Sequence, residues 1–302
     1  MPSPSALAPA CRAVAPGRIG LGAVTFGREI DAAASLALMD HAVSRGVRHF
    51  DTAAAYGQGA SEQLVGRWWA ERRPGDDAVL VATKVLPPYT RDSLAAAIEA
   101  SMRRLAPAQI GLLYLHRWDD ALDRPGAVEE VAQVAAEHGV ARLGASNFTT
   151  AQLSRTLGRL QAGGRAGWHA VQNNHNYAVS AFDAGLLAFC AAAGVAPFGY
   201  SPLGAGFLTG KHRAGVVPGS RFDVIPGHQQ IYFTVEARSR LARLEAVAQA
   251  TGHTPVALAL AWALQRPEVT VLVGGRTPGH LDQACAALAF ADRAALAALD
   301  AE

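Results

Sequence analysis

Short apolar runs alternate with segments of helical periodicity along the chain. The runs are rich in Val, Ile, Leu and Ala at successive positions, which is typical of strands buried on both faces. Such strands, each followed by a helix, predict an α/β fold with a parallel sheet. The eight runs lie at Ile19–Val24, Val47–Asp51, Ala78–Thr83, Ile110–His116, Val140–Ala145, Trp168–Gln172, Val195–Tyr200 and Val269–Val273.

The intervening segments predict helices with recognisable ends. Ser61 is expected to cap the second helix, with Glu62 in its first turn, where an acid suits the helix dipole. Trp68 and Trp69 are consecutive in that helix, which predicts that one faces inward and the other outward. Residues 201–234 are expected to form a long loop. The helices are expected at residues 31–45, from 61, at 91–105, 127–138, 150–160, 181–193, 235–251 and 255–265, and from 278.

Eight strand–helix units within this length predict one closed (β/α)8 TIM barrel, a single domain over residues 19–302. Residues 1–18 form a lead-in that could contribute a hairpin at the bottom of the barrel. The alternative is an open doubly wound sheet, which would carry a G-x-G-x-x-G fingerprint after an early strand. Gly20-x-Gly22 and Gly204-x-Gly206 both fall short of that pattern, so the barrel is favoured.

Composition narrows the class of protein. The chain has 302 residues, of which 50% are hydrophobic and 17% charged, with a formal net charge of +2 and no block of like charge. Nucleic acid and anionic membranes are therefore not expected as partners. Cys11, Cys190 and Cys285 are widely spaced and odd in number, which predicts reduced thiols and a cytoplasmic location. The uncharged stretch between Asp183 and Lys211 is broken by Gly and Pro, so it does not predict a membrane span.

Four polar side chains stand at or just beyond the carboxyl ends of successive strands. Asp51 ends the second strand and Tyr56 follows it in a small-residue loop, while Lys84 and His116 end the third and fourth. In a barrel these groups would meet at one mouth. Carbonyl reduction needs such a set, because a proton donor must stand beside the oxygen that becomes negative.

Lysine usage singles out one of these four residues. The chain has 27 Lys plus Arg, and only Lys84 and Lys211 are lysine. A lysine retained against such a bias indicates a position where arginine does not serve. An ammonium is a compact charge whose pKa shifts readily, whereas a guanidinium does not lose its proton.

In their local contexts and order, Asp51, Tyr56, Lys84 and His116 resemble the catalytic tetrad of the aldo-keto reductases. The resemblance extends from about Ile19 to about Leu288. It implies an enzyme in which Tyr56 is the general acid, Lys84 makes it a stronger acid, Asp51 holds Lys84, and His116 orients the substrate oxygen. A free tyrosine has a pKa near 10, and a neighbouring ammonium favours its ionised form.

The resemblance also implies a nicotinamide cofactor, with NADPH (NADP+) favoured over NADH. Ser146, Asn147 and Gln172 would bind the carboxamide, and Tyr200 would stack on the ring. A glycine-rich turn and cations would hold the phosphates, although Ala284 stands where relatives often have Asn. The expected cofactor contacts are Ala23, Asp51, Ser146, Asn147, Gln172, Tyr200, Ser201, Pro202, Leu203, Gly204, Gly206, Lys211, Arg221, Gly274, Arg276, Thr277, His280 and Gln283.

The substrate is expected to be a small carbonyl compound, with Phe26, Tyr89 and Trp118 joining Tyr56 and His116 in the pocket. No metal is expected, because the histidines form neither H-E-x-x-H nor a zinc-like cluster with cysteine. Two alternatives stay open: a cofactor-binding regulatory module like the potassium-channel β subunits, and a specialised sugar or secondary-metabolite reductase. The sequence leaves the oligomeric state open.

Overall fold

The computed structural model describes residues 17–75 and 78–301. Eight parallel strands close into one barrel in chain order, with β1 paired to both β2 and β8. The predicted single-domain (β/α)8 fold is therefore confirmed, while the lead-in expected at residues 1–18 lies outside the described residues except for its last two. The strands are β1 (Ile19–Gly22), β2 (His49–Asp51), β3 (Leu80–Val85), β4 (Leu112–Leu115), β5 (Leu143–Ser146), β6 (Ala170–Asn174), β7 (Ala196–Tyr200) and β8 (Thr270–Gly274).

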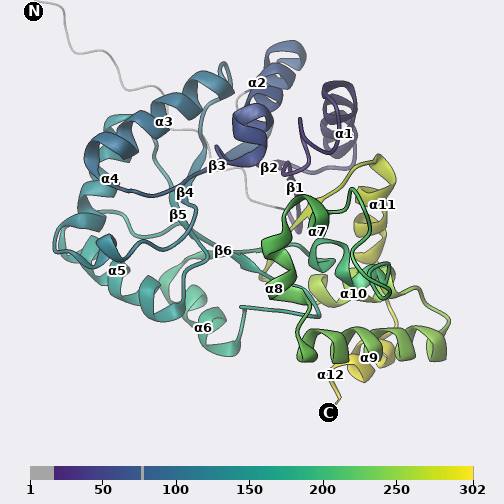
Figure 1. The fold of residues 1–302 in the computed structure, drawn as a ribbon. Helices are drawn as coiled ribbons and strands as arrows, with labels where there is room; N and C mark the ends of the chain where they lie inside the picture. The colour runs from purple at the N-terminus through teal and green to yellow at the C-terminus, as the bar shows by residue number, and fades with distance from the viewer. Residues whose placement is uncertain (1–16, 76–77, 302) are drawn as a thin grey trace, which may run out of the picture.

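Helices surround the strands, and α1 to α6 follow one another around the barrel (Figure 1). None of the described helices is both long enough and apolar enough to cross a membrane. The α-helices are α1 (Ala32–Ser44), α2 (Ala60–Arg72), α3 (Arg91–Leu105), α4 (Ala127–Glu137), α5 (Thr150–Ala162), α6 (Ala184–Ala193), α7 (Arg221–Val224), α8 (Gln229–Tyr232), α9 (Val235–Thr251), α10 (Pro255–Leu264), α11 (Pro278–Ala287) and α12 (Arg293–Asp300). The 3-10 turns are η1 (Tyr56–Gly59), η2 (Asp120–Asp123), η3 (Gly204–Thr209) and η4 (Pro226–His228).

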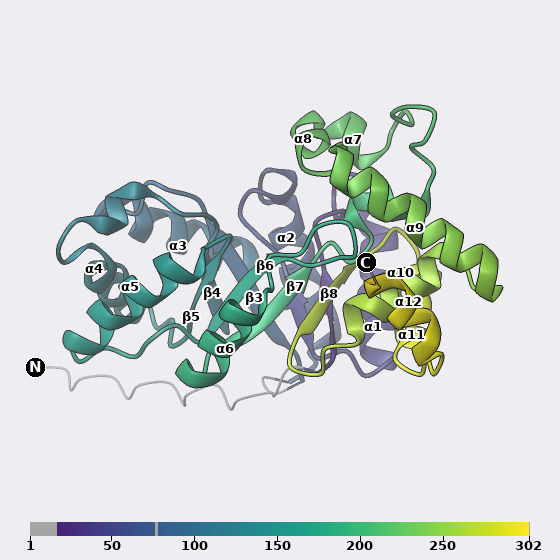
Figure 2. The same ribbon diagram turned by 90° about the horizontal axis from the view of Figure 1, so that it is seen from below.

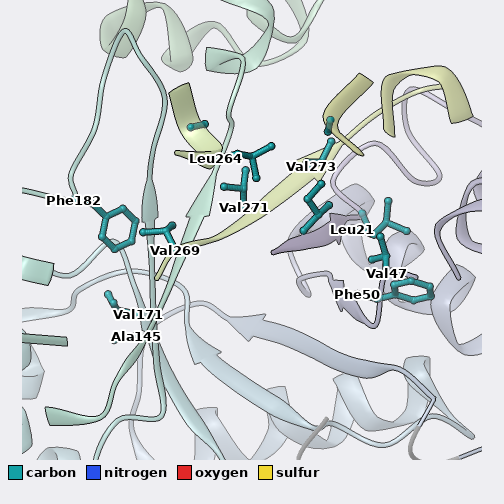
Figure 3. Packing of buried hydrophobic residues seen from close by; sticks show 14 of the residues in the cluster. Leu21, Val47, Phe50, Ala145, Val171, Phe182, Leu264, Val269, Val271 and Val273 are labelled. Atoms are coloured by element: carbon teal, nitrogen blue, oxygen red, sulfur yellow. The ribbon is translucent and has the colours of Figure 1, made fainter. Parts of the chain in front are cut away.

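The two faces of the strands have different surroundings, because alternate residues of a strand point to opposite sides. Outward residues such as Leu21, Val171 and Val271 pack with the helices in the main apolar core (Figure 3). Inward residues form a separate, smaller apolar cluster. The inward positions nearest the carboxyl ends of the strands are polar, so the barrel presents its chemistry at that end. The smaller cluster comprises Ala82, Leu112, Tyr114, Ala170, Phe198 and Leu272.

The start of α2 differs from the prediction. Its N-cap is Gly59, whose φ of 95° favours glycine. Ser61 is buried, lying 2.7 Å from the Thr52 hydroxyl and donating to the Ala23 carbonyl at 2.8 Å. The prediction that Ser61 caps the helix was wrong, because the ends of β1 and β2 supply its hydrogen-bond partners. Glu62 does lie in the first turn, but fully buried and paired with Arg104.

The two tryptophans of α2 also differ from the prediction. Trp68 is 2% exposed and Trp69 8% exposed, so neither faces solvent. The helix packs against both α1 and α3, which covers two adjacent faces. The indole of Trp68 donates a hydrogen bond to Asp40 on α1 at 2.8 Å. The expectation of one inward and one outward tryptophan was wrong. The helical period gives the direction of each side chain, but it does not say how many other elements pack around the helix.

Residues 201–234, here called the β7–α9 segment, are not a plain loop. They contain η3, α7, η4 and α8, and α7 and α8 lie beside the start of α9 (Figure 2). Phe207, Phe222, Tyr232 and Phe233 pack together, with 4.9 Å between the ring centroids of Phe222 and Phe233. These turns are too short to show a helical period in the sequence. Two further differences are the start of α6, where Asp183 is the N-cap, and the additional helix α12.

Candidate active site

The centre of the mouth is a buried ion pair between neighbouring strands. Lys84 of β3 places Nζ 2.5 Å from Oδ2 of Asp51, and the two side chains are 1% and 4% exposed. The ammonium also donates to the Thr52 carbonyl at 2.8 Å and to the Tyr56 hydroxyl at 3.3 Å, which uses its three donors. Burial opposes the charge, but Asp51 and Tyr56 outweigh it and raise the pKa of Lys84. The lysine is therefore charged at neutral pH.

Tyr56 is held on the loop between β2 and α2. The loop pairs with β3 through the Ala54 N–H, which donates to the Lys84 carbonyl at 3.0 Å. It then turns through left-handed conformations at Gly57, where φ is 56°, and at Gly59. The Lys84 ammonium lies 4.8 Å from the centroid of the Tyr56 ring. A phenol and an ammonium thus share one corner of the mouth.

His116 follows β4 directly and faces the same corner. Its ring centroid lies 5.9 Å from that of Tyr56, with the two rings nearly perpendicular at 79°. Burial, with the charges of Lys84 and Arg117, lowers the pKa of His116 to about 3. The imidazole is therefore neutral, with one N–H donor and one acceptor. Its buried Nδ1 has no hydrogen-bond partner within the described residues.

The structure thus brings the four predicted residues together. A phenol that can give up a proton stands beside a charged ammonium and a neutral imidazole that can donate a hydrogen bond. An oxygen atom that gains negative charge in this corner would meet two donors, Tyr56 and His116. Asp51 completes the set by keeping the ammonium of Lys84 in place. The arrangement suits proton transfer to or from an oxygen.

The ends of β5 and β6 carry three of the predicted amide-binding residues. Gln172 donates from Nε2 to Oδ1 of Asp51 at 2.8 Å. Asn147 donates to the His116 carbonyl at 3.0 Å and to the Ser146 hydroxyl at 3.1 Å, and it accepts from the Tyr200 hydroxyl at 2.6 Å. Asn147 therefore makes more hydrogen bonds within the protein than Ser146 or Gln172 does. The Ser146 hydroxyl accepts from Asn147 and donates in no hydrogen bond of the described chain, while the Gln172 amide also lies close to the Tyr114 hydroxyl.

These residues fit the carboxamide of a nicotinamide ring. A primary amide offers one carbonyl acceptor and two N–H donors, which complement the Ser146 hydroxyl and the Gln172 oxygen. Tyr200 ends β7 beside them, and burial raises its pKa, so it remains a neutral phenol. Its bond to Asn147 fixes the direction of the ring. A flat ring and an amide can therefore be held at the same place.

The β7–α9 segment brings cations to the other side of the mouth. Lys211 lies over Gly206, where a Cβ would come within 3.3 Å of Nζ. Burial and the charge of Arg276 lower the pKa of Lys211. Burial also lowers the pKa of Arg221, which contacts Glu29 at 3.3 Å. Cations whose charged forms are disfavoured by burial and by the neighbouring charge of Arg276 suit an anion such as a phosphate.

Further groups of the β7–α9 segment also suit a phosphate. The Ser220 hydroxyl is buried and has no hydrogen-bond partner in the described part of the chain. Gly204, with a φ of 58°, packs closely on Tyr232, so the turn leaves room only for backbone there. Both features fit a phosphate approached by N–H and O–H donors. Ala23, Pro202 and Gly204 are buried, whereas Ser201 and Leu203 are half-buried.

The end of β8 supplies the remaining predicted cofactor residues. Arg276 donates to the Gly219 carbonyl at 3.0 Å and so ties the β8 loop to the β7–α9 segment. The Arg276 N–H donates to Nδ1 of His280 at 3.1 Å, which holds the loop against α11. Ala284 is buried in the core. Gly274, Thr277, His280 and Gln283 are exposed.

The three aromatic residues predicted to join the substrate pocket differ in how deeply they are buried. Phe26 is fully buried in the core, and buried Tyr89 donates to the Arg117 carbonyl at 2.8 Å. Trp118 is half-buried and bonded to Asp120. Leu86, directly after β3, is 43% exposed. It stands two residues after Lys84, and alternate strand residues share a face.

Metal ligands form no group of three or more within the described residues. The fold and the site together define a barrel oxidoreductase that acts on a small-molecule substrate. The chain belongs to the aldo/keto reductase family, because the family model, "Aldo/keto reductase family", matches residues 18–297. Carbonyl reduction is the general activity of this family, which generally uses nicotinamide cofactors.

Three relatives of this chain illustrate the range of proteins in the family. The protein is 27% identical over 287 residues to "Uncharacterized oxidoreductase YrpG" of Bacillus subtilis (strain 168), covering 87% of this chain and 85% of that one. It is 32% identical over 213 residues to "Aflatoxin B1 aldehyde reductase member 2" of Rattus norvegicus, covering 68% and 58%. It is 27% identical over 292 residues to "Putative voltage-gated potassium channel subunit beta" of Schizosaccharomyces pombe (strain 972 / ATCC 24843), covering 90% and 84%.

Proposed function

We propose that this protein is an NADP(H)-dependent reductase that converts an aldehyde or ketone into an alcohol, with Tyr56 as the general acid. The observation that carries the proposal is the position of the Lys84 ammonium, 2.5 Å from Asp51 and 3.3 Å from the Tyr56 hydroxyl. A buried charge at that distance favours the phenolate that remains after proton transfer. The proposed cytoplasmic location agrees with the free thiols of Cys190 and Cys285.

In the proposed reaction the substrate oxygen lies between the Tyr56 hydroxyl and the His116 ring. A bound nicotinamide cofactor would supply the hydride. Tyr56 gives its proton to the oxygen as negative charge develops there, and Lys84 stabilises the phenolate. His116, being neutral, donates a hydrogen bond without competing for that proton. In the oxidative direction Tyr56 takes the proton back.

The preference for NADPH rests on the cations at the far side of the mouth. Burial and the charge of Arg276 lower the pKa of both Lys211 and Arg221, and within the described residues the acid that contacts these cations is Glu29. Arg276 stands before the first turn of α11, where helix N–H groups also favour an anion. A 2′-phosphate would supply the negative charge that this cluster lacks. Buried Ala284 offers no hydrogen bond to the adenine, so binding strength is proposed to come from the phosphates.

The experiment follows NADPH absorbance on mixing purified protein with a panel of aldehydes, ketones and keto-sugars. Wild type and Tyr56→Phe are compared, and NADH is the second cofactor. Turnover with NADPH that is lost in the variant, while the variant still binds NADPH, supports the proposal. Failure of the wild type to bind either nicotinamide cofactor contradicts it.

The regulatory-module alternative draws on the relative named as a putative potassium-channel β subunit. That alternative places no demand on a complete tetrad, whereas all four groups converge here. A specialised sugar or secondary-metabolite reductase would use the same tetrad, so the best substrate of the panel identifies it. Tight NADPH binding without turnover on any carbonyl would favour the regulatory module.

A further inference from the structure

Gln172 makes a contact across the interior of the barrel. It lies on β6 and Asp51 on β2, which are not neighbours in the closed sheet. The Nε2 atom nevertheless donates to Oδ1 of Asp51 at 2.8 Å, and the two residues are 2% and 3% exposed. Oδ2 of the same carboxylate receives the Lys84 ammonium. Asp51 is therefore shared between an amide and an ammonium that approach from opposite sides.

The other titratable groups around Asp51 are neutral. Beneath it on β2, burial lowers the pKa of His49 to about 4. On β4, burial and the charge of Asp51 raise the pKa of Tyr114 well above its usual value. His116 is neutral for the reason already given, and Tyr56 is the remaining phenol. Lys84 is thus the one cation that faces the carboxylate from the described strands, and Gln172 is a second source of positive potential.

A hydrogen bond in such an interior has a large electrostatic effect, because water does not screen it. The Gln172 N–H dipole offsets part of the negative charge of Asp51. Without it, Asp51 would draw more strongly on Lys84, and the phenolate of Tyr56 would be less stabilised. The Tyr114 hydroxyl also lies close to the Gln172 amide and interacts with it. The amide oxygen of Gln172 can in addition receive the N–H of a carboxamide at the mouth.

We propose that Gln172 is a positioning residue that couples nicotinamide binding to the acidity of Tyr56. Its oxygen holds the carboxamide while its Nε2 stays on Asp51, so the contacts Gln172–Asp51–Lys84–Tyr56 form one polar chain across the barrel. The cofactor half of this inference rests on the proposed function. The half that concerns Tyr56 does not, since it can be measured without cofactor.

The test is a spectroscopic titration of Tyr56 in the protein without cofactor. Tyrosinate absorbance is followed with pH for each protein and for the same protein carrying Tyr56→Phe, and the difference isolates Tyr56. Gln172→Met removes the donor at similar volume. It should raise the midpoint of the Tyr56 titration by about 0.5–1 pH unit, less than the full effect of a hydrogen bond to a charged group, because the lost bond is to Asp51 and acts on Tyr56 through Lys84. It should also weaken NADPH binding, measured by quenching of tryptophan fluorescence, by about tenfold.

Ser146→Ala is the matched control. It removes the other proposed carboxamide contact but does not touch Asp51, so it should weaken NADPH binding without moving the Tyr56 titration. Gln172→Asn is the second disruptive variant, in case Gln172→Met does not fold. It keeps an amide at the buried site, but its side chain is one methylene shorter and is withdrawn from Asp51. Its titration midpoint should move in the same direction.

Three results would overturn the inference. The first is an unchanged Tyr56 titration in the folded Gln172 variants, and the second is an equal shift in Ser146→Ala. The third is unchanged NADPH affinity in the Gln172 variants, which would break the coupling to the cofactor. If wild type reduces no carbonyl but the titration shift is found, the proposed function fails while the positioning of Tyr56 by Gln172 stands.

Discussion

The two sides of the barrel mouth are built differently. On the side of β2, β3 and β4, Lys84 is buried and all three of its ammonium donors have partners. On the side of β7 and β8, Lys211 is exposed overall. Partial desolvation of its ammonium and the charge of Arg276 lower its pKa. The first side is complete within the protein, whereas the second carries positive charge in excess. We infer that the first is prepared for chemistry and the second for an anion.

The two lysines of the chain allow the largest test of this comparison. Lys84→Met should lower the free energy of unfolding by about 3–5 kcal/mol, because it leaves the buried Asp51 carboxylate unpaired. Turnover should fall by about 10²–10⁴-fold, since Tyr56 loses its neighbouring charge. Denaturant unfolding and NADPH absorbance measure the two effects.

Lys211→Met is the matched control, with the same chemical change on the other side of the mouth. It should leave stability within about 0.5 kcal/mol of wild type, as is usual for an exposed side chain. Equal destabilisation by both substitutions would show that the two sides are not built differently.

The buried histidines predict how stability changes with pH. The folded pKa of His49 is lowered from 6.5 to about 4, so the folded protein binds this proton less readily than the unfolded chain. Its contribution is therefore present above pH 6.5 and is lost as pH falls towards 4. By linkage the loss approaches about 3 kcal/mol, an order-of-magnitude figure for a buried group.

Unfolding by urea at a series of pH values measures this loss. His49→Phe should flatten the decline. A decline that persists unaltered in His49→Phe would assign the pH dependence to other groups.

Arg276 tests the anion side directly. Arg276→Ala should weaken NADPH binding by about 10–100-fold, the effect of losing a hydrogen bond to a charged group. NADH binding should change much less, because NADH lacks the 2′-phosphate. Fluorescence titration measures both affinities, with Arg103→Ala on the outside of α3 as the control cation. Equal losses for the two cofactors would remove Arg276 from the proposed 2′-phosphate site.

The smallest expected effect concerns the glycine turn. Gly206 has a φ of 95°, and a Cβ there would crowd Lys211 at 3.2–3.3 Å. Gly206→Ala should lower the free energy of unfolding by about 1–2 kcal/mol through backbone strain, and should weaken NADPH binding a few-fold by displacing Lys211. Gly215→Ala in the same segment, where φ is 130° and a Cβ would meet nothing within 4 Å, is the control. It should share the strain but keep the affinity.

Many of these features could be predicted from the sequence. The eight apolar runs correspond to the eight strands, although β1 ends at Gly22 and not at Val24. The residues Asp51, Lys84 and His116 were found because a polar residue at the end of an apolar run is a local signal. The barrel then brings successive strand ends to one mouth, so their convergence followed from fold class alone.

The start of α2 shows where local signals were insufficient. Ser61 has the sequence position of a helix cap, and Glu62 that of an exposed first-turn acid. In the structure Ser61 bonds to the ends of β1 and β2, and Glu62 accepts hydrogen bonds from Thr83 at 2.5 Å and Arg104 at 2.6 Å. The sequence position of each residue was recognised, but the hydrogen-bond partners of the two residues come from the ends of β1 and β2, from β3 and from α3.

By itself, the sequence determined the class of fold, the order of the elements and the four groups of the mouth. Those properties are written in periodicity and in which residue ends each strand. Only the tertiary structure decided that Gln172 bonds to Asp51, 121 residues away in the chain, and that the aromatic residues of the β7–α9 segment pack into short helices. The physical reason is that such contacts form only when the barrel closes, because closure sets which inward side chains meet across the interior.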